Sequence, residues 1–145
     1  MILANFCGKN SGAKTTHAIF FIPTNLEDLR DRLSKIIVGY KDDGTPVQAK
    51  EINAVGSMMS LLRYAIQPNI VQTTEGQPVF VHTGPFGNIA HGCCSVVSDQ
   101  LALGYADYVL TEAGFGADLG FEKFMHIKAR LNNLEPDAAV IVASV

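Results

Sequence analysis

The chain has 145 residues, of which 48% are hydrophobic and 17% charged, and its formal net charge is −3. This length fits one globular domain rather than two, and the composition excludes a disordered chain. The slightly acidic balance argues against a dedicated nucleic-acid-binding protein, and no apolar run reaches the roughly 20 residues that span a bilayer. The first residues also lack the basic stretch of a secretory signal.

The three cysteines, Cys7, Cys93 and Cys94, are odd in number, and two of them are adjacent. This pattern indicates free thiols in a reducing compartment, so we expect a cytoplasmic protein. Without C-x-x-C spacing or a histidine cluster, we expect no metal site. Because no base partner is evident, we interpret Cys93 and Cys94 as small buried residues.

The run GKNSGAKTT at residues 8–16 is similar to the phosphate-binding pattern G-x-x-x-x-G-K-[ST], in which backbone N–H groups and a lysine hold a phosphate. Ala13 opposes the match because it places a Cβ where the second glycine belongs, and Pro23 follows too soon for a long helix. We therefore favour a polar turn. We expect no nucleotide-binding residue here, with Lys14 and Thr15 as the weak alternative.

The next part of the chain predicts a helix and then a β-hairpin. Thr24 or Asn25 caps the helix, and the turn DDG at residues 42–44 joins strands at residues 36–40 and 46–48. The side chains expected on the buried stripe of the helix are Leu26, Leu29 and Leu33.

A second helix is predicted over residues 50–66, followed by a short extended segment at residues 70–72 and a turn at residues 75–78. Its apolar face carries Ile52, Val55, Met59, Leu62 and Ile66. Met58 and Met59 are interpreted as core filler, since methionine adapts to irregular gaps.

Three apolar, β-rich runs follow, at residues 79–82, 108–111 and 138–145. The two segments between them begin with glycine-rich turns and continue with helical patterning. This order predicts an α/β fold with a parallel β-sheet and crossover helices. The last run does not alternate, which is typical of a strand buried on both faces, so we expect a fold truncated at both ends.

Both glycine-rich loops, at residues 84–92 and 112–120, follow predicted strands and should lie at the carboxyl edge of the sheet, where ligands bind. Around the first loop, His82, Asn88 and His91 are candidates for catalysis, because these side chains donate and accept hydrogen bonds and imidazole shuttles protons. The alternative is that the histidines only satisfy local backbone groups.

In the second loop, Glu112 follows a strand, and Phe115 stands between two glycines that cannot bury its ring. A displayed ring can stack on a flat ligand. Asp118 is either the N-cap of a helix over residues 119–130 or a ligand to a cation or hydroxyl, and we favour the cap. The basic side chains expected on the solvated face of that helix are Lys123, His126 and Lys128.

Taken together, these segments resemble the formate–tetrahydrofolate ligase family, in its bacterial monofunctional form. The segments that carry the resemblance are NLEDLRDRLSKIIVGY at residues 25–40, QPNIVQTTEGQPVFVHTGPFGNIAHG at residues 67–92, ADYVLTEAGFGADLGFEKF at residues 106–124 and DAAVIVASV at residues 137–145. The likeness extends over residues 18–145, which we expect to form a single α/β domain, and leaves residues 1–17 unmatched.

The resemblance implies an ATP-dependent ligase that converts formate to formyl phosphate and then formylates N10 of tetrahydrofolate. It also implies a P-loop-NTPase-like fold, a homotetramer, and a requirement for Mg²⁺ and a monovalent cation. By residue, Phe115 matches the ring that stacks on the pterin, and Glu112 and Asp118 match carboxylates near that pocket. His82, Asn88 and His91 match the glycine loop near the active site.

Several family features fall outside this chain. The phosphate loop and the cations that hold formyl phosphate lie upstream of the matched region, and a tryptophan beside the pterin has no counterpart because the chain has no Trp. Thr83 and Gly87 stand where the family usually has Gly and Ala. We therefore expect an inactive fragment of the ligase. The alternatives are a non-catalytic truncated module that keeps the fold and subunit contacts, and a small nucleotide hydrolase using Lys14.

Overall fold

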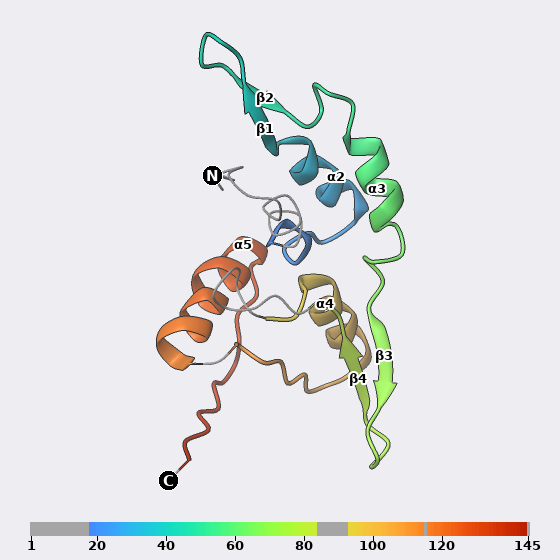
Figure 1. The fold of residues 1–145 in the computed structure, drawn as a ribbon. Helices are drawn as coiled ribbons and strands as arrows, with labels where there is room; N and C mark the ends of the chain where they lie inside the picture. Colours follow the sequence, from blue (N-terminus) through green and yellow to red (C-terminus); the bar gives the residue numbers. More distant parts are fainter. Residues whose placement is uncertain (1–17, 84–92, 115, 145) are drawn as a thin grey trace.

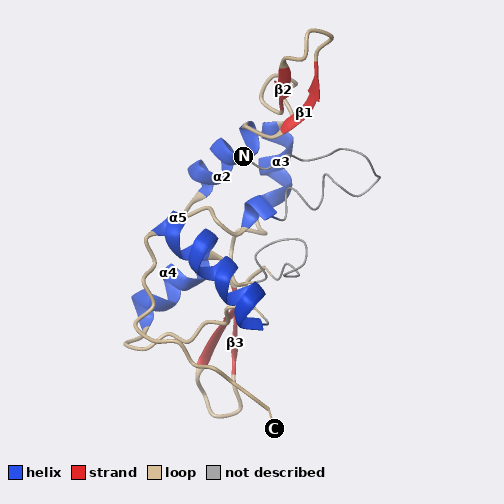
Figure 2. Ribbon diagram, turned by 90° about the vertical axis from the view of Figure 1, so that its left-hand side faces the viewer, coloured by secondary structure: helices blue, strands red, loops and turns tan. Residues whose placement is uncertain are grey.

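The computed structural model describes residues 18–83, 93–114 and 116–144. Its elements follow one another along an elongated path (Figure 1). A hairpin of β1 (Ile37–Tyr40) and β2 (Pro46–Gln48) lies at one end, beside helices α2 (Leu26–Ser34) and α3 (Val55–Leu62). Helix α4 (Val96–Tyr105) and the last helical segment follow, with a hairpin of β3 (Asn69–Gln72) and β4 (Pro78–Val81) toward the other end. A side view shows the same order (Figure 2). The protein is a small α/β structure with two antiparallel sheets.

Helix α2, Leu26–Ser34, begins where the sequence predicts. The Asn25 side chain caps it by accepting a hydrogen bond from the Asp28 N–H at 2.9 Å. Asp28 also accepts a hydrogen bond from Arg32 Nε at 2.8 Å, one turn along. Leu29 and Leu33 are fully buried, as predicted, but Leu26 is 48% exposed, so the buried stripe is narrower than predicted.

The predicted hairpin is confirmed as β1, Ile37–Tyr40, paired antiparallel with β2, Pro46–Gln48. Gly44 takes a φ of 82° at its turn, a conformation that favours glycine. The first of two hydrophobic clusters lies at the base of this hairpin, between α2 and α3. Its buried members are Phe20, Leu29, Leu33, Ile36, Ala49 and Val55, with Met58 and Met59 packed at its margin as predicted.

Helix α3 is shorter than predicted: it spans Val55–Leu62 rather than residues 50–66. Asn53 has a φ of 56°, which is left-handed and cannot continue an α-helix. The preceding residues instead form a turn closed by a hydrogen bond from the Ala54 N–H to the Ala49 carbonyl at 3.2 Å. Ile52 falls in this turn and is exposed. Apolar spacing alone therefore overestimated the helix.

The strand predicted at residues 79–82 is found as β4, Pro78–Val81, but its pairing differs from the prediction. It pairs antiparallel with β3, Asn69–Gln72, with Ile70 opposite Phe80. A short turn joins the two strands, so their contact closes only a small loop at low entropic cost. A parallel pair would need a crossover connection between distant segments. The parallel sheet predicted for this region is not seen among the described residues.

The other two predicted strands have no regular structure. Residues 108–111 and 138–144 run as irregular backbone in the structure. Their apolar side chains face solvent: Leu110 is 91% exposed, and Ile141 is 85% exposed. The chain-terminal segment extends away from the rest of the molecule (Figure 1).

The helices predicted after the two glycine-rich loops are confirmed. Helix α4, Val96–Tyr105, is capped by Ser95, whose Oγ accepts a hydrogen bond from the Ser98 N–H at 3.1 Å. The second helical segment is built mainly of wide π-type turns: η1, Gly116–Phe121, η2, Phe124–Ala129, and the short α5, Arg130–Asn132. A second hydrophobic cluster lies beneath this segment, with Cys93, Phe124 and Ala129 at its centre.

Within the part of the chain that the structure describes, no helix combines the length and apolar character needed to cross a membrane.

Candidate functional site

The segment that starts at Cys93 and runs into α4 supports both regions that the sequence marks as functional. His82, at the end of β4, contacts it through Ser95. Glu112, at the start of the second loop, lies near enough to Cys93 and Asp99 to raise the pKa of both groups. Ala113, next to Glu112, also packs against the cluster that contains Cys93, so His82 and the start of the second loop both lie beside this segment, although the predicted parallel sheet is not what joins them.

His82 is 4% exposed, and both of its ring nitrogens have protein partners. Nε2 lies 2.7 Å from the Ala65 carbonyl oxygen, and Nδ1 lies 2.5 Å from Ser95 Oγ. The Phe20 ring packs edge-on against the imidazole at a centroid distance of 5.8 Å. The side chain is therefore enclosed, which agrees with the alternative in which this histidine satisfies local groups.

The partners of His82 assign its tautomer. A carbonyl oxygen only accepts hydrogen bonds, so Nε2 carries the proton that goes to Ala65. Nδ1 then accepts from the Ser95 hydroxyl, and Ser95 Oγ in turn accepts from the Ser98 N–H. This arrangement ties the turn after α3, the residue that follows β4 and the cap of α4 together. Ser95 was missed from sequence; its position just before an apolar helix is the cap signal that identifies it.

Cys93 and Cys94 behave as structural thiols. Cys93 is 1% exposed, and burial raises the pKa of its thiol to about 11, so the unreactive thiol form dominates at neutral pH. Cys94 is partly buried, donates to the His82 carbonyl at 3.2 Å and contacts Ser98 Oγ at 2.9 Å. The prediction of small buried residues is confirmed for Cys93 and holds in part for Cys94.

Contacts within the second glycine-rich loop, at residues 112–120, hold its backbone in place. Glu112 Oε2 accepts a hydrogen bond from the Gly114 N–H at 2.8 Å. Gly114 and Gly116 have φ values of 75° and 78°, a conformation that side chains disfavour. A Cβ at Gly120 would lie 2.5 Å from the Gly114 carbonyl carbon, so the first helical turn sits directly against the loop. The glycines here serve a close approach of backbone to backbone.

Asp118 lies inside the first turn of η1 and not before it, because the helix begins at Gly116. The predicted N-cap at Asp118 is therefore wrong, since glycine in the left-handed region starts the helical turns earlier. Asp118 and Glu112 are both exposed, which leaves their carboxylates accessible to a ligand. An acidic group in a first helical turn is also favoured by the helix dipole.

Lys128 is fully buried, which corrects the prediction that it lies on the solvated face. Its Nζ forms an ion pair with Asp99 Oδ2 at 2.5 Å, the sole polar contact found for this ammonium within the described residues. The Phe124 ring centroid lies 5.2 Å from Nζ. Burial raises the pKa of Asp99, and Lys128 opposes that rise. A sequence signal was present: Lys128 lies four residues after the buried Phe124, on the same helical face. His126, in contrast, is exposed as predicted.

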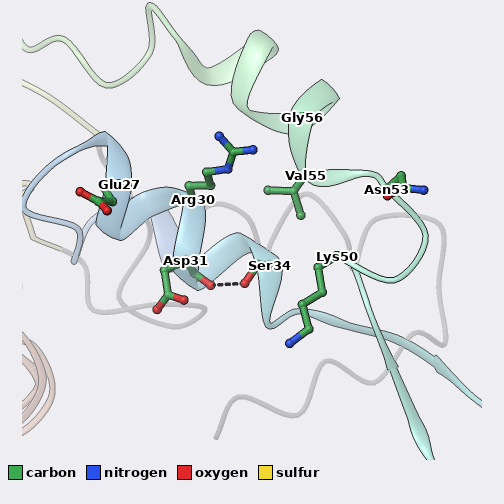
Figure 3. Close-up of a pocket in the computed structure, with 8 residues that line it drawn as sticks. All are labelled: Glu27, Arg30, Asp31, Ser34, Lys50, Asn53, Val55 and Gly56. Carbon is green, nitrogen blue, oxygen red and sulfur yellow. Dashed lines mark hydrogen bonds between the residues drawn. The ribbon is translucent and has the colours of Figure 1, made fainter.

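A shallow cavity of about 430 Å³ lies elsewhere, between α2 and α3 (Figure 3). Charges of both signs line it, and Arg30 extends from α2 toward α3 (Figure 3). Ser34, which also lines it, donates from Oγ to the Asp31 carbonyl at 2.7 Å. None of the residues that the sequence marks as functional lines this cavity.

Five of the predicted site residues lie outside the described residues: Lys14, Thr15, Asn88, His91 and Phe115. Their expected roles stay predictions. Among the described residues, no group of histidine, cysteine and carboxylate side chains is arranged to hold a metal ion.

Comparison with known proteins identifies the family. The model of the family described as formate–tetrahydrofolate ligase matches residues 10–145. The chain belongs to this family. The match begins upstream of residue 18, where the sequence resemblance was placed, so part of the expected unmatched segment is included.

Two bacterial relatives show the extent of the likeness. The formate–tetrahydrofolate ligase of Saccharopolyspora erythraea is 53% identical over 135 residues, which cover 93% of this chain and 24% of the relative. That of Symbiobacterium thermophilum is 52% identical over 149 aligned positions, which cover 95% of this chain and 27% of the relative. The chain thus spans about a quarter of the length of these curated relatives, as a ligase fragment would.

Proposed function

We propose that this chain provides the tetrahydrofolate-side part of a formate–tetrahydrofolate ligase. In the whole reaction, ATP phosphorylates formate, and the formyl group of formyl phosphate then passes to N10 of tetrahydrofolate with release of phosphate. The family match over residues 10–145 carries this proposal.

The geometry of the second loop supports the folate side of the reaction. Glu112 and Asp118 are exposed at its two ends, and carboxylates there can accept hydrogen bonds from the amino and ring N–H groups of a pterin. We assign Phe115, between them, to one wall of the pterin slot, where an aromatic ring gains by offset stacking. The left-handed Gly114 and Gly116 fix the backbone on either side of it.

The candidate residues in and beside the first loop have two proposed roles: one positions the loop, and two contact substrate. His82 is enclosed by Ala65, Ser95 and Phe20, so we assign it to holding the base of the loop at residues 84–92. We keep Asn88 and His91 as the residues of this loop that contact substrate.

We assign ATP binding to parts of a full-length ligase other than this chain. No metal-ligand group is found in the described residues, so no step is assigned here to Mg²⁺ or to a monovalent cation. We propose that the rest of a full-length ligase chain binds ATP and supplies the parallel sheet of a P-loop-NTPase-like fold. We further propose that the full-length protein is a cytoplasmic homotetramer.

The first test concerns the chain alone. Phosphoryl transfer depends on positioning and charge stabilisation, so a chain without the nucleotide loop should lose nearly all of its rate. We expect no formate- and tetrahydrofolate-dependent release of ADP from the purified chain. Measurable release would contradict the division of the site proposed here.

The second test restores the missing part. The matching 24% of the Saccharopolyspora erythraea ligase is replaced by this chain, and the chimera is assayed for 10-formyltetrahydrofolate. We expect activity, and we expect Phe115→Ala to raise KM for tetrahydrofolate about twofold to thirteenfold, equivalent to about 0.5–1.5 kcal/mol of stacking, with KM for ATP unchanged. An inactive, folded chimera would instead favour the non-catalytic module.

A further inference from the structure

The ion pair between Asp99 and Lys128 joins the two helical segments that carry the candidate loops. Asp99 lies on α4, which follows the first loop, and Lys128 lies on η2, which follows the second. Lys128 is fully buried, and Asp99 is 8% exposed. α4 and η2 are not among the elements of the described chain that pack extensively against each other. The ion pair is therefore the contact that fixes how α4 and η2 are oriented toward each other, since the two elements do not pack broadly together.

The position of the loop at residues 112–120 depends on the helical segment that begins with η1. Gly120 lies near the end of η1, and a Cβ added there would lie 2.6 Å from the Ala113 carbonyl oxygen and 2.5 Å from the Gly114 carbonyl carbon, so no side chain fits. A shift of the helical segment would therefore push on the loop backbone. Ala113 also packs at the margin of the cluster formed by Cys93, Phe124 and Ala129, just beside the ion pair.

The opposite partner is fixed as well. Helix α4 is capped by Ser95, and Ser95 is bonded to His82, whose second ring nitrogen is bonded to Ala65. Asp99 thus lies on a helix whose start is hydrogen-bonded to His82 and, through His82, to Ala65. Because Lys128 bonds to Asp99, the position of Asp99 on α4 determines where the Lys128 ammonium lies.

We infer that the Asp99–Lys128 ion pair is a positioning device, which aligns the folate-side loop at residues 112–120 with α4 and with the His82–Ser95 contact at the start of that helix. This inference rests on the proposed function for the meaning of the alignment. Lys128 and Asp99 are positioning residues, because they act through the loop and touch no substrate themselves.

A role in positioning differs from a role in stability alone. Removing one partner of a buried ion pair leaves an uncompensated charge, whereas replacing both partners by apolar side chains of similar size is often neutral or stabilising. Apolar replacement keeps the packing but removes the directed contact. The double variant Asp99→Leu/Lys128→Met therefore separates the two roles, and it provides a folded protein where Lys128→Met alone fails to fold.

The first experiment uses the chain itself and measures amide hydrogen exchange. In the double variant, we expect exchange at residues 112–114 and 116–120 to accelerate about tenfold or more, with α2 and α3 unchanged. The matched control is Arg130→Met, which removes an exposed cation from the same helical segment and should leave the loop unchanged. Uniform acceleration along the chain, or none in the loop, would overturn the inference.

The second experiment uses the chimeric ligase described above, with tetrahydrofolate, formate and ATP as probes. We expect the double variant to raise KM for tetrahydrofolate at least about fivefold, with KM for ATP changed less than about twofold, because misplacement affects only the folate side. An unchanged KM for tetrahydrofolate, or equal rises for both substrates, would overturn the positioning role. An inactive parent chimera would refute the proposed function instead, and the exchange experiment would still decide whether the ion pair holds the loop.

Discussion

Thr83 occupies a backbone conformation that suits glycine. Its φ is 61°, in the left-handed region, which a β-branched residue rarely adopts and which costs about 1–2 kcal/mol. The Thr83 hydroxyl donates to the neighbouring His82 carbonyl at 2.5 Å, a local contact that offsets part of this cost. The sequence resemblance placed a glycine here in the family, and the structure gives the physical reason for it.

Replacing Thr83 by glycine should therefore stabilise the chain. We expect a gain of about 0.5–1 kcal/mol in the free energy of unfolding, because relief of the strained φ exceeds the added entropy of glycine in the unfolded chain. Urea unfolding of the purified variant measures this. Thr45→Gly is the control: Thr45 has an ordinary φ beside β2, so the same change there should destabilise. A loss of stability at Thr83 equal to that at Thr45 would contradict the argument.

His82 makes a separate prediction at the residue scale. Its imidazole bonds both Ala65 and Ser95 in a buried position, so His82→Ala removes one hydrogen-bond partner from each and takes away the ring that packs against Phe20. We expect a loss of about 2–4 kcal/mol in unfolding free energy. His126→Ala, at an exposed position, should cost less than about 0.5 kcal/mol. Similar small losses for both variants would show that the buried bonds are not formed in solution.

At the scale of elements, local sequence chemistry was a good guide. The Asn25 cap, the DDG turn and the helical patterning after the first glycine-rich loop act within a few residues of chain, and a helix, a hairpin and a second helix formed accordingly. Failures came from contacts that the pattern does not encode. Asn53 shortens α3 by entering the left-handed region, and Lys128 is buried because Asp99, far away in sequence, offers it a carboxylate.

We expect replacement by alanine to have opposite effects on stability at two glycines. Gly120 leaves no space for a Cβ, so Gly120→Ala should displace the loop at residues 113–114 and cost about 1–3 kcal/mol. Gly104 lies in α4, and a Cβ added there would have no neighbouring atom within 4 Å, so Gly104→Ala should stabilise by about 0.5–1 kcal/mol. Thermal unfolding of both variants tests the pair. A stabilising Gly120→Ala would mean that the helical segment does not press on the loop.

At the scale of the whole molecule, the sequence predicted the family and the helices but not the sheet. Parallel strands gain their hydrogen bonds from partners distant in sequence, and the described residues provide only the local partner of a hairpin. Composition marks residues 138–144 as strand-forming, yet strand formation requires a partner as well as a propensity. The same holds for the candidate site. The loop glycines and Glu112 could be predicted from the sequence, whereas the buried hydrogen bonds of His82 and Ser95 could not, because they depend on tertiary contacts.

The apolar segment at residues 138–144 leads to the last prediction. Val140 is 85% exposed and Val142 is 92% exposed, and an exposed β-branched run without a charge is a template for association between chains. Replacing both valines by lysine adds like charges to this segment and should lower self-association at high concentration, as measured by sedimentation velocity. The urea midpoint should stay unchanged, because neither side chain is buried. Val96→Lys is the matched control: Val96 is fully buried, so the same substitution there should unfold the chain. If the two exposed positions instead proved as intolerant of lysine as Val96, the segment would be packed in solution, and the exposure of its valines to solvent would be disproved.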